Sequence, residues 1–169
     1  MKVKIKKLTK VPTPSKAYDS DFCYDCVAVS EEEVAPNVWK YGLGIAFQIE
    51  RGHETIVVSH VIHGGKKREH HTKIDFSRSP IHLAIDARPR SSVWETGMVL
   101  SNCEGTIDEG YIGEVSAVFY HVMTNMPRYK VGDKVCQIKL GFTLPMEFEE
   151  VSVLDSTLRG DKGYGSSGR

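Results

Sequence analysis

The sequence predicts an all-β fold, either a barrel or a roll of two sheets, and three observations lead to that prediction. Apolar and polar residues alternate with a period of two in several short segments, which is the pattern of half-buried strands. No stretch of a dozen residues has a convincing 3.6-residue period. Gly, Pro and Asn interrupt the segments at short intervals, as expected where strands reverse direction.

Five segments carry the strand pattern most clearly, and they are distributed along the whole chain. In order they are residues 3–6, 45–50, 114–122, 134–140 and 148–154. Their alternating apolar side chains would form the buried face of a sheet. Turn-forming pairs stand at Pro36-Asn37 and Gly132-Asp133, and residues 91–97 are long enough for one helical turn.

A histidine-rich stretch separates the second and third of these segments. Six of the seven histidines lie between His53 and His82, and Lys66-Lys67-Arg68 lies in the same interval. The strand-like residues 55–62 precede Gly64-Gly65, so we expect a β-hairpin with a basic, His-rich tip. Both a solvated hairpin and an arm that binds an anion, a metal or a partner protein fit this composition.

The composition indicates one globular domain and excludes several classes of protein. Hydrophobic residues make up 40% of the 169 residues, and 22 basic residues balance 22 acidic ones. With no net charge, nucleic acid is not an expected partner. No apolar run approaches the ~20 residues of a membrane span, and no signal-type core follows the first lysines, so we expect a cytoplasmic protein or, if viral, one inside the host cell.

The four cysteines do not form a metal-binding or disulfide framework. Cys23 and Cys26 make a single C-x-x-C, with no second pair at zinc-ribbon spacing. Packed thiols in a reducing compartment are therefore favoured over a redox or metal role.

Chemistry-bearing residues are concentrated between residues 88 and 113 and in the last eleven residues. Arg90-Ser91-Ser92 begins the short helical segment, where free N–H groups can meet phosphate. Asp108 lies in a glycine-bounded turn, where a carboxylate can accept a proton from water. The final segment, 159–169, combines Gly, Ser, Arg and Tyr164. It cannot bury a core by itself, but it suits closure over a nucleotide phosphate chain.

The order of these pieces resembles that of the homotrimeric dUTPase family, whose five motifs can be followed along the chain. The family's A-G-x-D-L motif is degenerate here, and Asp21 stands at the position of its Asp. Its P-R-S-G, G-x-I-D-x-x-Y-x-G, G-D-x-x-x-Q and R-G-x-G-G-F-G-S-T-G motifs correspond to residues 89–92, 105–113, 132–137 and 159–168. The unusually long connection between Gly44 and Pro89 indicates an insertion at about 52–82.

The resemblance implies a dUTPase-like jelly roll, also called a β-clip, assembled as a homotrimer. Residues 1–155 would form the β domain, and residues 156–169 would form a C-terminal lid. The implied reaction is Mg²⁺-dependent hydrolysis of dUTP to dUMP and pyrophosphate. The implied partners are dUTP, two further copies of the chain, and a protein that contacts the insertion.

The same resemblance assigns roles to individual residues. Asp108 would activate the attacking water, and Tyr111 would pack on the deoxyribose and exclude a 2′-hydroxyl. The uracil would be read from the hairpin by Asn102, Gly105, Thr106 and Ile107, with Ser116 nearby. The phosphates would be held by Arg90, Ser91, Ser92 and Gln137. In the lid, Arg159 and Ser166 would reach the γ-phosphate, Tyr164 would stack on uracil beside Gly165, and Asp21 would support the Mg²⁺ waters or position an arginine.

Departures from the family pattern leave alternatives open. Ser92, Gly110 and Lys162 replace a Gly, an Asp and a Gly of the motifs. R-S-S and the third motif are also similar to dCTP deaminases, but Val118 stands where those enzymes carry an essential Glu. A non-catalytic dUTP sensor or a partner-binding protein on the same scaffold is the other alternative.

Overall fold

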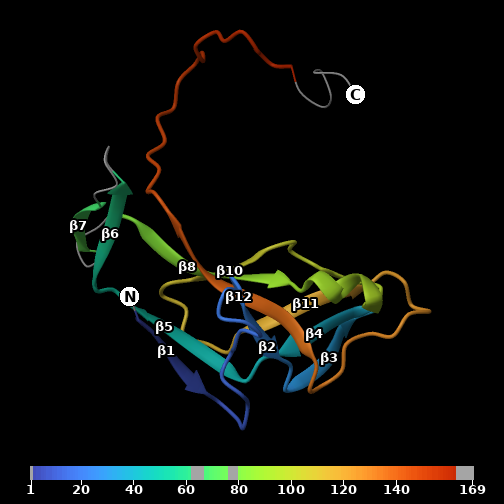
Figure 1. Ribbon diagram of the computed structural model, residues 1–169. Helices are drawn as coiled ribbons and strands as arrows, with labels where there is room; N and C mark the ends of the chain where they lie inside the picture. The colour runs from blue at the N-terminus through green and yellow to red at the C-terminus, as the bar shows by residue number, and fades with distance from the viewer. Residues whose placement is uncertain (1, 62–66, 76–79, 163–169) are drawn as a thin grey trace.

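The computed structural model describes residues 2–61, 67–75 and 80–162, and the predicted all-β class is confirmed (Figure 1). Two four-stranded antiparallel sheets form the body, in the orders β10-β8-β12-β2 and β3-β4-β11-β9. Two further pairs, β1-β5 and β6-β7, are attached to them. One short 3₁₀-helix, η1 (Ser91–Thr96), joins β8 to β9, where the sequence predicted a single helical turn.

The strands have the following bounds: β1 Lys2–Lys7, β2 Tyr24–Val27, β3 Ser30–Ala35, β4 Val38–Gly42, β5 Ile45–Glu50, β6 His53–Val61, β7 Lys67–Asp75, β8 His82–Pro89, β9 Met98–Leu100, β10 Gly105–Asp108, β11 Ser116–His121 and β12 Lys134–Thr143. The alternating segments predicted at 3–6, 45–50, 114–122 and 134–140 all coincide with strands. In β8 the pattern is regular, because Leu83, Ile85 and Ala87 are buried while the residues between them are not. These alternations place one face of each sheet on a shared core.

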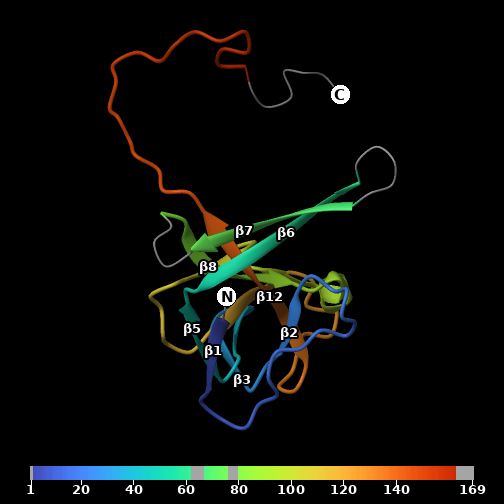
Figure 2. The ribbon, with the colours of Figure 1, turned by 60° about the vertical axis from the view of Figure 1, so that its left-hand side comes forward.

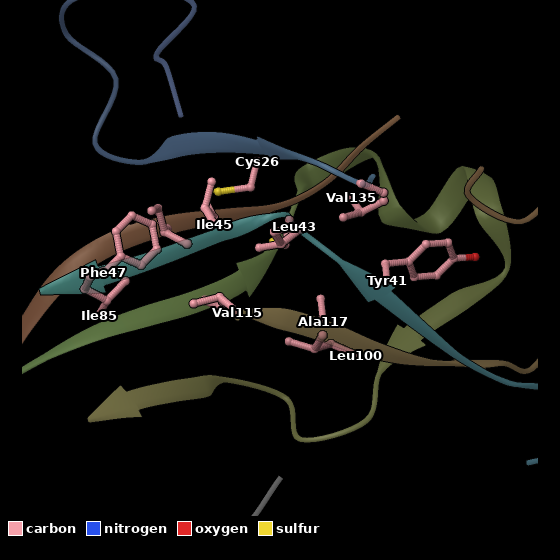
Figure 3. Close-up of a cluster of buried hydrophobic side chains, with 14 of the residues drawn as sticks. Cys26, Tyr41, Leu43, Ile45, Phe47, Ile85, Leu100, Val115, Ala117 and Val135 are labelled. Atoms are coloured by element: carbon pink, nitrogen blue, oxygen red, sulfur yellow. The ribbon is translucent and has the colours of Figure 1, made fainter. Parts of the chain in front are cut away.

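The core lies between the two sheets (Figure 3). Tyr41 and Phe119 are fully buried and meet edge to face, with ring centroids 6.0 Å apart, and Tyr129 packs against both. The Tyr41 hydroxyl donates a hydrogen bond to the carbonyl of Tyr129 at 2.9 Å, so its polar end is satisfied. Full burial of each large side chain stabilises the fold by about 1.5–3 kcal/mol.

The prediction of a last strand at residues 148–154 is wrong. The segment that follows β12 has no strand and runs away from the body in both ribbon views (Figures 1 and 2). Its apolar side chains are exposed, including Phe148 at 87% and Leu154 at 84%. Alternation alone does not make a strand when the chain supplies no neighbouring edge to pair with.

The predicted hairpin is confirmed as the β6–β7 pair, which projects from the body in Figure 2. The register runs from His53 opposite Asp75 to Val61 opposite Lys67. The predicted tip around Gly64-Gly65 lies outside the described residues. We call residues 53–75 the arm; it leaves the body after β5 and returns at β8.

Candidate functional site

The third motif folds as a short strand between two tight turns. Strand β10 pairs with β8, so that Gly105 lies opposite Ala87 and Asp108 opposite Ala84. After β10 the N–H of Tyr111 donates to the carbonyl of Asp108 at 3.0 Å, which closes a four-residue turn. Asp108 is exposed at the first position of this turn, where water can reach its carboxylate.

The ring of Tyr111 lies back across the chain that follows it. Its hydroxyl donates to the carbonyl of Glu114 at 2.9 Å. A Cβ on Gly113 would stand 2.5 Å from the Tyr111 hydroxyl oxygen, so only glycine permits this approach. The ring is therefore held in one orientation while 48% of the residue remains exposed, and it presents an aromatic surface next to Asp108.

Two adjoining hollows of about 250 and 190 Å³ open between β10 and β11, and we call them together the β10 hollow. They share Thr106, Ile107 and Ser116. The structure thus brings together seven residues that the sequence singled out: Asn102, Gly105, Thr106, Ile107, Asp108, Tyr111 and Ser116. Val118 also lines the hollow, in the part whose lining contains no carboxylate.

A second hollow, of about 340 Å³, lies beside β2 and the start of η1, and we call it the β2 hollow. It brings together four further predicted residues, Asp21, Arg90, Ser91 and Gln137. The amide of Gln137 donates to the carbonyl of Pro89 at 3.2 Å. Ser92 lies just outside, where its hydroxyl accepts a 3.4 Å hydrogen bond from Arg90. The hollow combines a guanidinium, a hydroxyl and an amide, which are the donors that hold phosphate.

Asp25 is the residue of the β2 hollow that the sequence reasoning missed. One of its carboxylate oxygens accepts from Arg90 Nε at 3.0 Å and the other from Lys134 Nζ at 2.9 Å. Its side chain is only 14% exposed. Asp21, which the motif comparison favoured, accepts instead from the N–H of Tyr18 at 2.9 Å. Residues 19–25 contain several carboxylates. Only the register of β2 against β12 shows which of them contacts Arg90.

The two hollows lie far apart within one chain. Asp108 pairs with Ala84 near the start of β8, whereas Arg90 follows the last residue of that strand. Ala84 and Arg90 are six residue steps apart, which corresponds to about 20 Å of extended chain at the usual rise per residue. Asp108 and Arg90 therefore lie toward opposite ends of β8.

The C-terminal motif is only partly within the described residues. Arg159 Nε donates to the carbonyl of Lys162 at 3.1 Å across a turn in which Gly160 has a φ of 57°. Tyr164, Gly165 and Ser166 lie outside the described residues. Their predicted contacts with a nucleotide therefore stay predictions.

The described residues contain no cluster of three or more His, Cys, Asp or Glu side chains suited to hold a metal ion. The four cysteines are free thiols. Cys26 lies opposite Cys136 across β2 and β12, and this contact together with burial raises the pKa of the Cys26 thiol far above its ordinary value. No helix in the described ranges is long and apolar enough to cross a membrane.

Comparison with known proteins gives one consistent result. The dUTPase family model matches residues 61–168. The deoxyuridine 5′-triphosphate nucleotidohydrolase of Finegoldia magna is 40% identical over 90 residues, which cover 53% of this chain and 63% of that protein. The enzyme of the same name from Corynebacterium glutamicum is 29% identical over 99% of this chain and 95% of its own length.

Solved structures of phage proteins share the fold. The dUTPase of Staphylococcus bacteriophage 80alpha, solved with dUpNHpp, superposes with a TM-score of 0.67 at 18% identity and 99% coverage of both chains. The dUTPase of phage phi11 of S. aureus, solved to visualise a species-specific insert, gives a TM-score of 0.61 at 16% identity, covering 93% of this chain and all of that one.

Proposed function

The chain belongs to the dUTPase family, and on that premise we propose that it hydrolyses dUTP to dUMP and pyrophosphate. The observation that carries the proposal is the β10 hollow, in which an exposed carboxylate and a fixed tyrosine ring stand beside a short strand. This arrangement fits a nucleoside whose phosphates leave the hollow next to Asp108.

In the proposed reaction Asp108 accepts a proton from the water that attacks the α-phosphorus. A carboxylate that water can reach suits this role, because the base must lie within hydrogen-bond reach of the proton it accepts. Tyr111 would cover the deoxyribose and leave no room for a 2′-hydroxyl. The edge of the uracil would meet the main chain of residues 102–108, with the side chains of Asn102 and Ser116 at either side.

The phosphates would bind in the β2 hollow, through Arg90, Ser91 and Gln137 and with Ser92 beside them. Phosphoryl transfer depends mainly on alignment and on neutralisation of charge. The Arg90 guanidinium, held in place by Asp25, would supply a positive charge at a fixed position. Mg²⁺ would supply further charge neutralisation on the phosphate oxygens. The residues fit an ion held mainly by the substrate, since the hollow offers Asp21 as a nearby carboxylate but no dense carboxylate cage.

We propose that the active site is shared between chains of a homotrimer. Two observations support this assembly. Asp108 and Arg90 lie toward opposite ends of β8, about 20 Å apart along the strand, which favours their acting from different chains. The segment after β12 also exposes apolar side chains, such as Leu144 and Val153 at 63% and 81%, which a neighbouring chain can cover. Residues 156–169 would then close as a lid over a site on another chain.

The alternatives are weaker. A deaminase would need a carboxylate in the part of the β10 hollow that Val118 lines, and none lines that part. A role in binding a partner protein through the arm is compatible with hydrolysis and is part of the proposal. The location that fits this substrate is the interior of a cell, either the protein's own or that of a host.

The test is release of pyrophosphate from dUTP with Mg²⁺, with dCTP, TTP and UTP as competing substrates and Asp108→Ala as the variant. We expect selective hydrolysis of dUTP, and a loss of about 10²- to 10⁴-fold in the variant, which is the usual contribution of a general base. Binding of dUTP by folded wild-type protein without hydrolysis would instead assign the chain to nucleotide sensing.

A further inference from the structure

Glu109, the residue directly after Asp108, is joined to the root from which the arm leaves the body. Its carboxylate accepts hydrogen bonds from Nε and Nη2 of Arg51, each at 2.7 Å. Arg51 follows the last residue of β5 and stands two residues before the arm begins. Leu83, in the second position of β8, lies beside Glu109, and its main chain lowers the pKa of the Glu109 carboxyl. One carboxylate is thus fixed by the residue at the point where the arm leaves the body.

The geometry of the Arg51–Glu109 pair is that of a strong, oriented contact. Two parallel N–H···O bonds fix the carboxylate plane as well as its position, which a single contact does not. The two side chains are 25% and 28% exposed, so solvent competes less than at an open surface. In agreement, Arg51 first, and then the Leu83 main chain and His82, hold the pKa of Glu109 below its ordinary 4.5.

Glu109 occupies the second position of the turn that carries the functional groups. The first position is Asp108, and the fourth is Tyr111, whose N–H closes the turn on the Asp108 carbonyl. The third position, Gly110, has no atom within 4 Å of where a Cβ would stand. Glu109 is therefore the side chain by which the interior of this turn is anchored to the body, and its partner is Arg51, at the root of the arm.

We propose that Glu109 is a positioning residue that, through Arg51, clamps the Asp108–Tyr111 turn in its working geometry and couples it to the arm. This inference rests on the proposed function, because the working geometry is that of Asp108 toward its water. The clamp acts on the placement of Asp108, and so on the rate of the chemical step more than on the affinity for the nucleotide.

The experiment compares Glu109→Gln, Arg51→Ala, the double variant and Arg51→Lys, all in the full chain. The measurements are kcat and KM for dUTP with Mg²⁺, and the affinity for dUpNHpp. Misplacement of a catalytic group by about 1 Å can cost ~10²-fold in rate. We therefore expect kcat to fall about 10- to 100-fold in Glu109→Gln and Arg51→Ala, with KM and analogue affinity changed less than about threefold.

The double-mutant cycle separates this pair from every other contact of Arg51. We expect the double variant to be no slower than the slower single variant, since both remove one interaction. Arg51→Lys keeps the charge but not the two-pronged geometry, so it should lie between wild type and Arg51→Ala. Glu50→Gln, which removes the adjacent carboxylate that pairs with Lys4 at 3.4 Å, is the control and should behave as wild type.

A readout independent of activity is hydrogen exchange at the Tyr111 amide, which should be faster in Glu109→Gln because the turn it closes is less restrained. If the wild type does not hydrolyse dUTP but exchange at the Tyr111 amide is faster in Glu109→Gln, the clamp is supported and the proposed function fails. If wild type is active and the folded variants keep both its kcat and its exchange rate, the clamp is refuted. Additive losses in the cycle would also refute it.

Discussion

Asp25 is the carboxylate that holds Arg90 in the β2 hollow, and its removal tests how this hollow is organised. We consider Asp25→Ala, which deletes the acceptor of both Arg90, at 3.0 Å, and Lys134, at 2.9 Å. Lys134 is 44% exposed, so its contact is worth at most about 1 kcal/mol. The Arg90 contact is less exposed and charge-assisted, worth about 1.5–3 kcal/mol. The free energy of unfolding should fall by about 2–3 kcal/mol.

For a chain of this length, 1 kcal/mol corresponds to roughly 2–4 °C in Tm, so the midpoint should fall by about 4–12 °C. Catalysis should suffer as well, because Arg90 loses the partner that orients it toward the phosphates. If its phosphate contact is worth about 1.5–3 kcal/mol, its misplacement lowers kcat/KM by about 10- to 100-fold. Thermal unfolding at fixed protein concentration and pyrophosphate release report the two effects separately.

The matched variant is Asp21→Ala, at the carboxylate that the motif comparison favoured. It removes only the 2.9 Å acceptor of the Tyr18 N–H, in an exposed contact at the edge of the same hollow. We expect a smaller loss of both Tm and kcat/KM than for Asp25→Ala. The reverse order, with Asp25→Ala close to wild type and Asp21→Ala strongly impaired, would refute the assignment of Asp25 as the partner of Arg90.

Three further predictions concern other parts of the chain. Gly113→Ala should lower kcat/KM and Tm, because its Cβ would stand 2.5 Å from the Tyr111 hydroxyl oxygen. Gly110→Ala is the control and should fold as wild type, since the space around its Cβ is open. Equal losses of Tm in the two variants would contradict the prediction. Tyr111→Phe deletes the 2.9 Å hydrogen bond to the Glu114 carbonyl and should relax discrimination against UTP, measured as the ratio of the two kcat/KM values. Arg128 holds the pKa of Glu31 below its ordinary 4.5, so their contribution to stability is complete above that pH and is lost as the pH falls through the lower, folded value. Glu31→Gln should flatten the acid limb of the curve of unfolding free energy against pH, and an unchanged limb would show that the pair does not contribute.

The regular strands were predictable because their alternation is matched by a partner in the same chain. Residues 45–50 and 134–140 lie against neighbours that bury their apolar side chains, such as Phe47 and Ile49 in the first segment and Val135 and Ile138 in the second. Strand β8 offers the same signal in Leu83, Ile85 and Ala87 but was missed, since it directly follows the histidine-rich stretch. Strand β3 is harder to predict, because its Glu-rich sequence on a sheet edge has no alternation of apolar residues.

The candidate site was predictable where function depends on local sequence, and not where it depends on register. The glycine-bounded segment 105–113 contains its own turn, and the Tyr111 hydroxyl reaches only as far as the carbonyl of Glu114, so the shape follows from adjacent residues. Asp25 and the Arg51–Glu109 pair join residues 65 and 58 positions apart. No pattern within either short segment reveals such a pairing, because it is decided by which strands lie side by side.

In the proposed trimer, the separation of Asp108 and Arg90 along β8 would have a genetic consequence. In a trimer whose sites each take one residue from one chain and the other from its neighbour, two different inactive chains can complement each other. If Asp108→Ala and Arg90→Ala chains are unfolded, mixed in equal amounts and refolded, about a quarter of the active sites would by chance receive an intact Asp108 from one chain and an intact Arg90 from another. Two defective alleles in one cell would therefore yield a working protein, although neither allele does so alone.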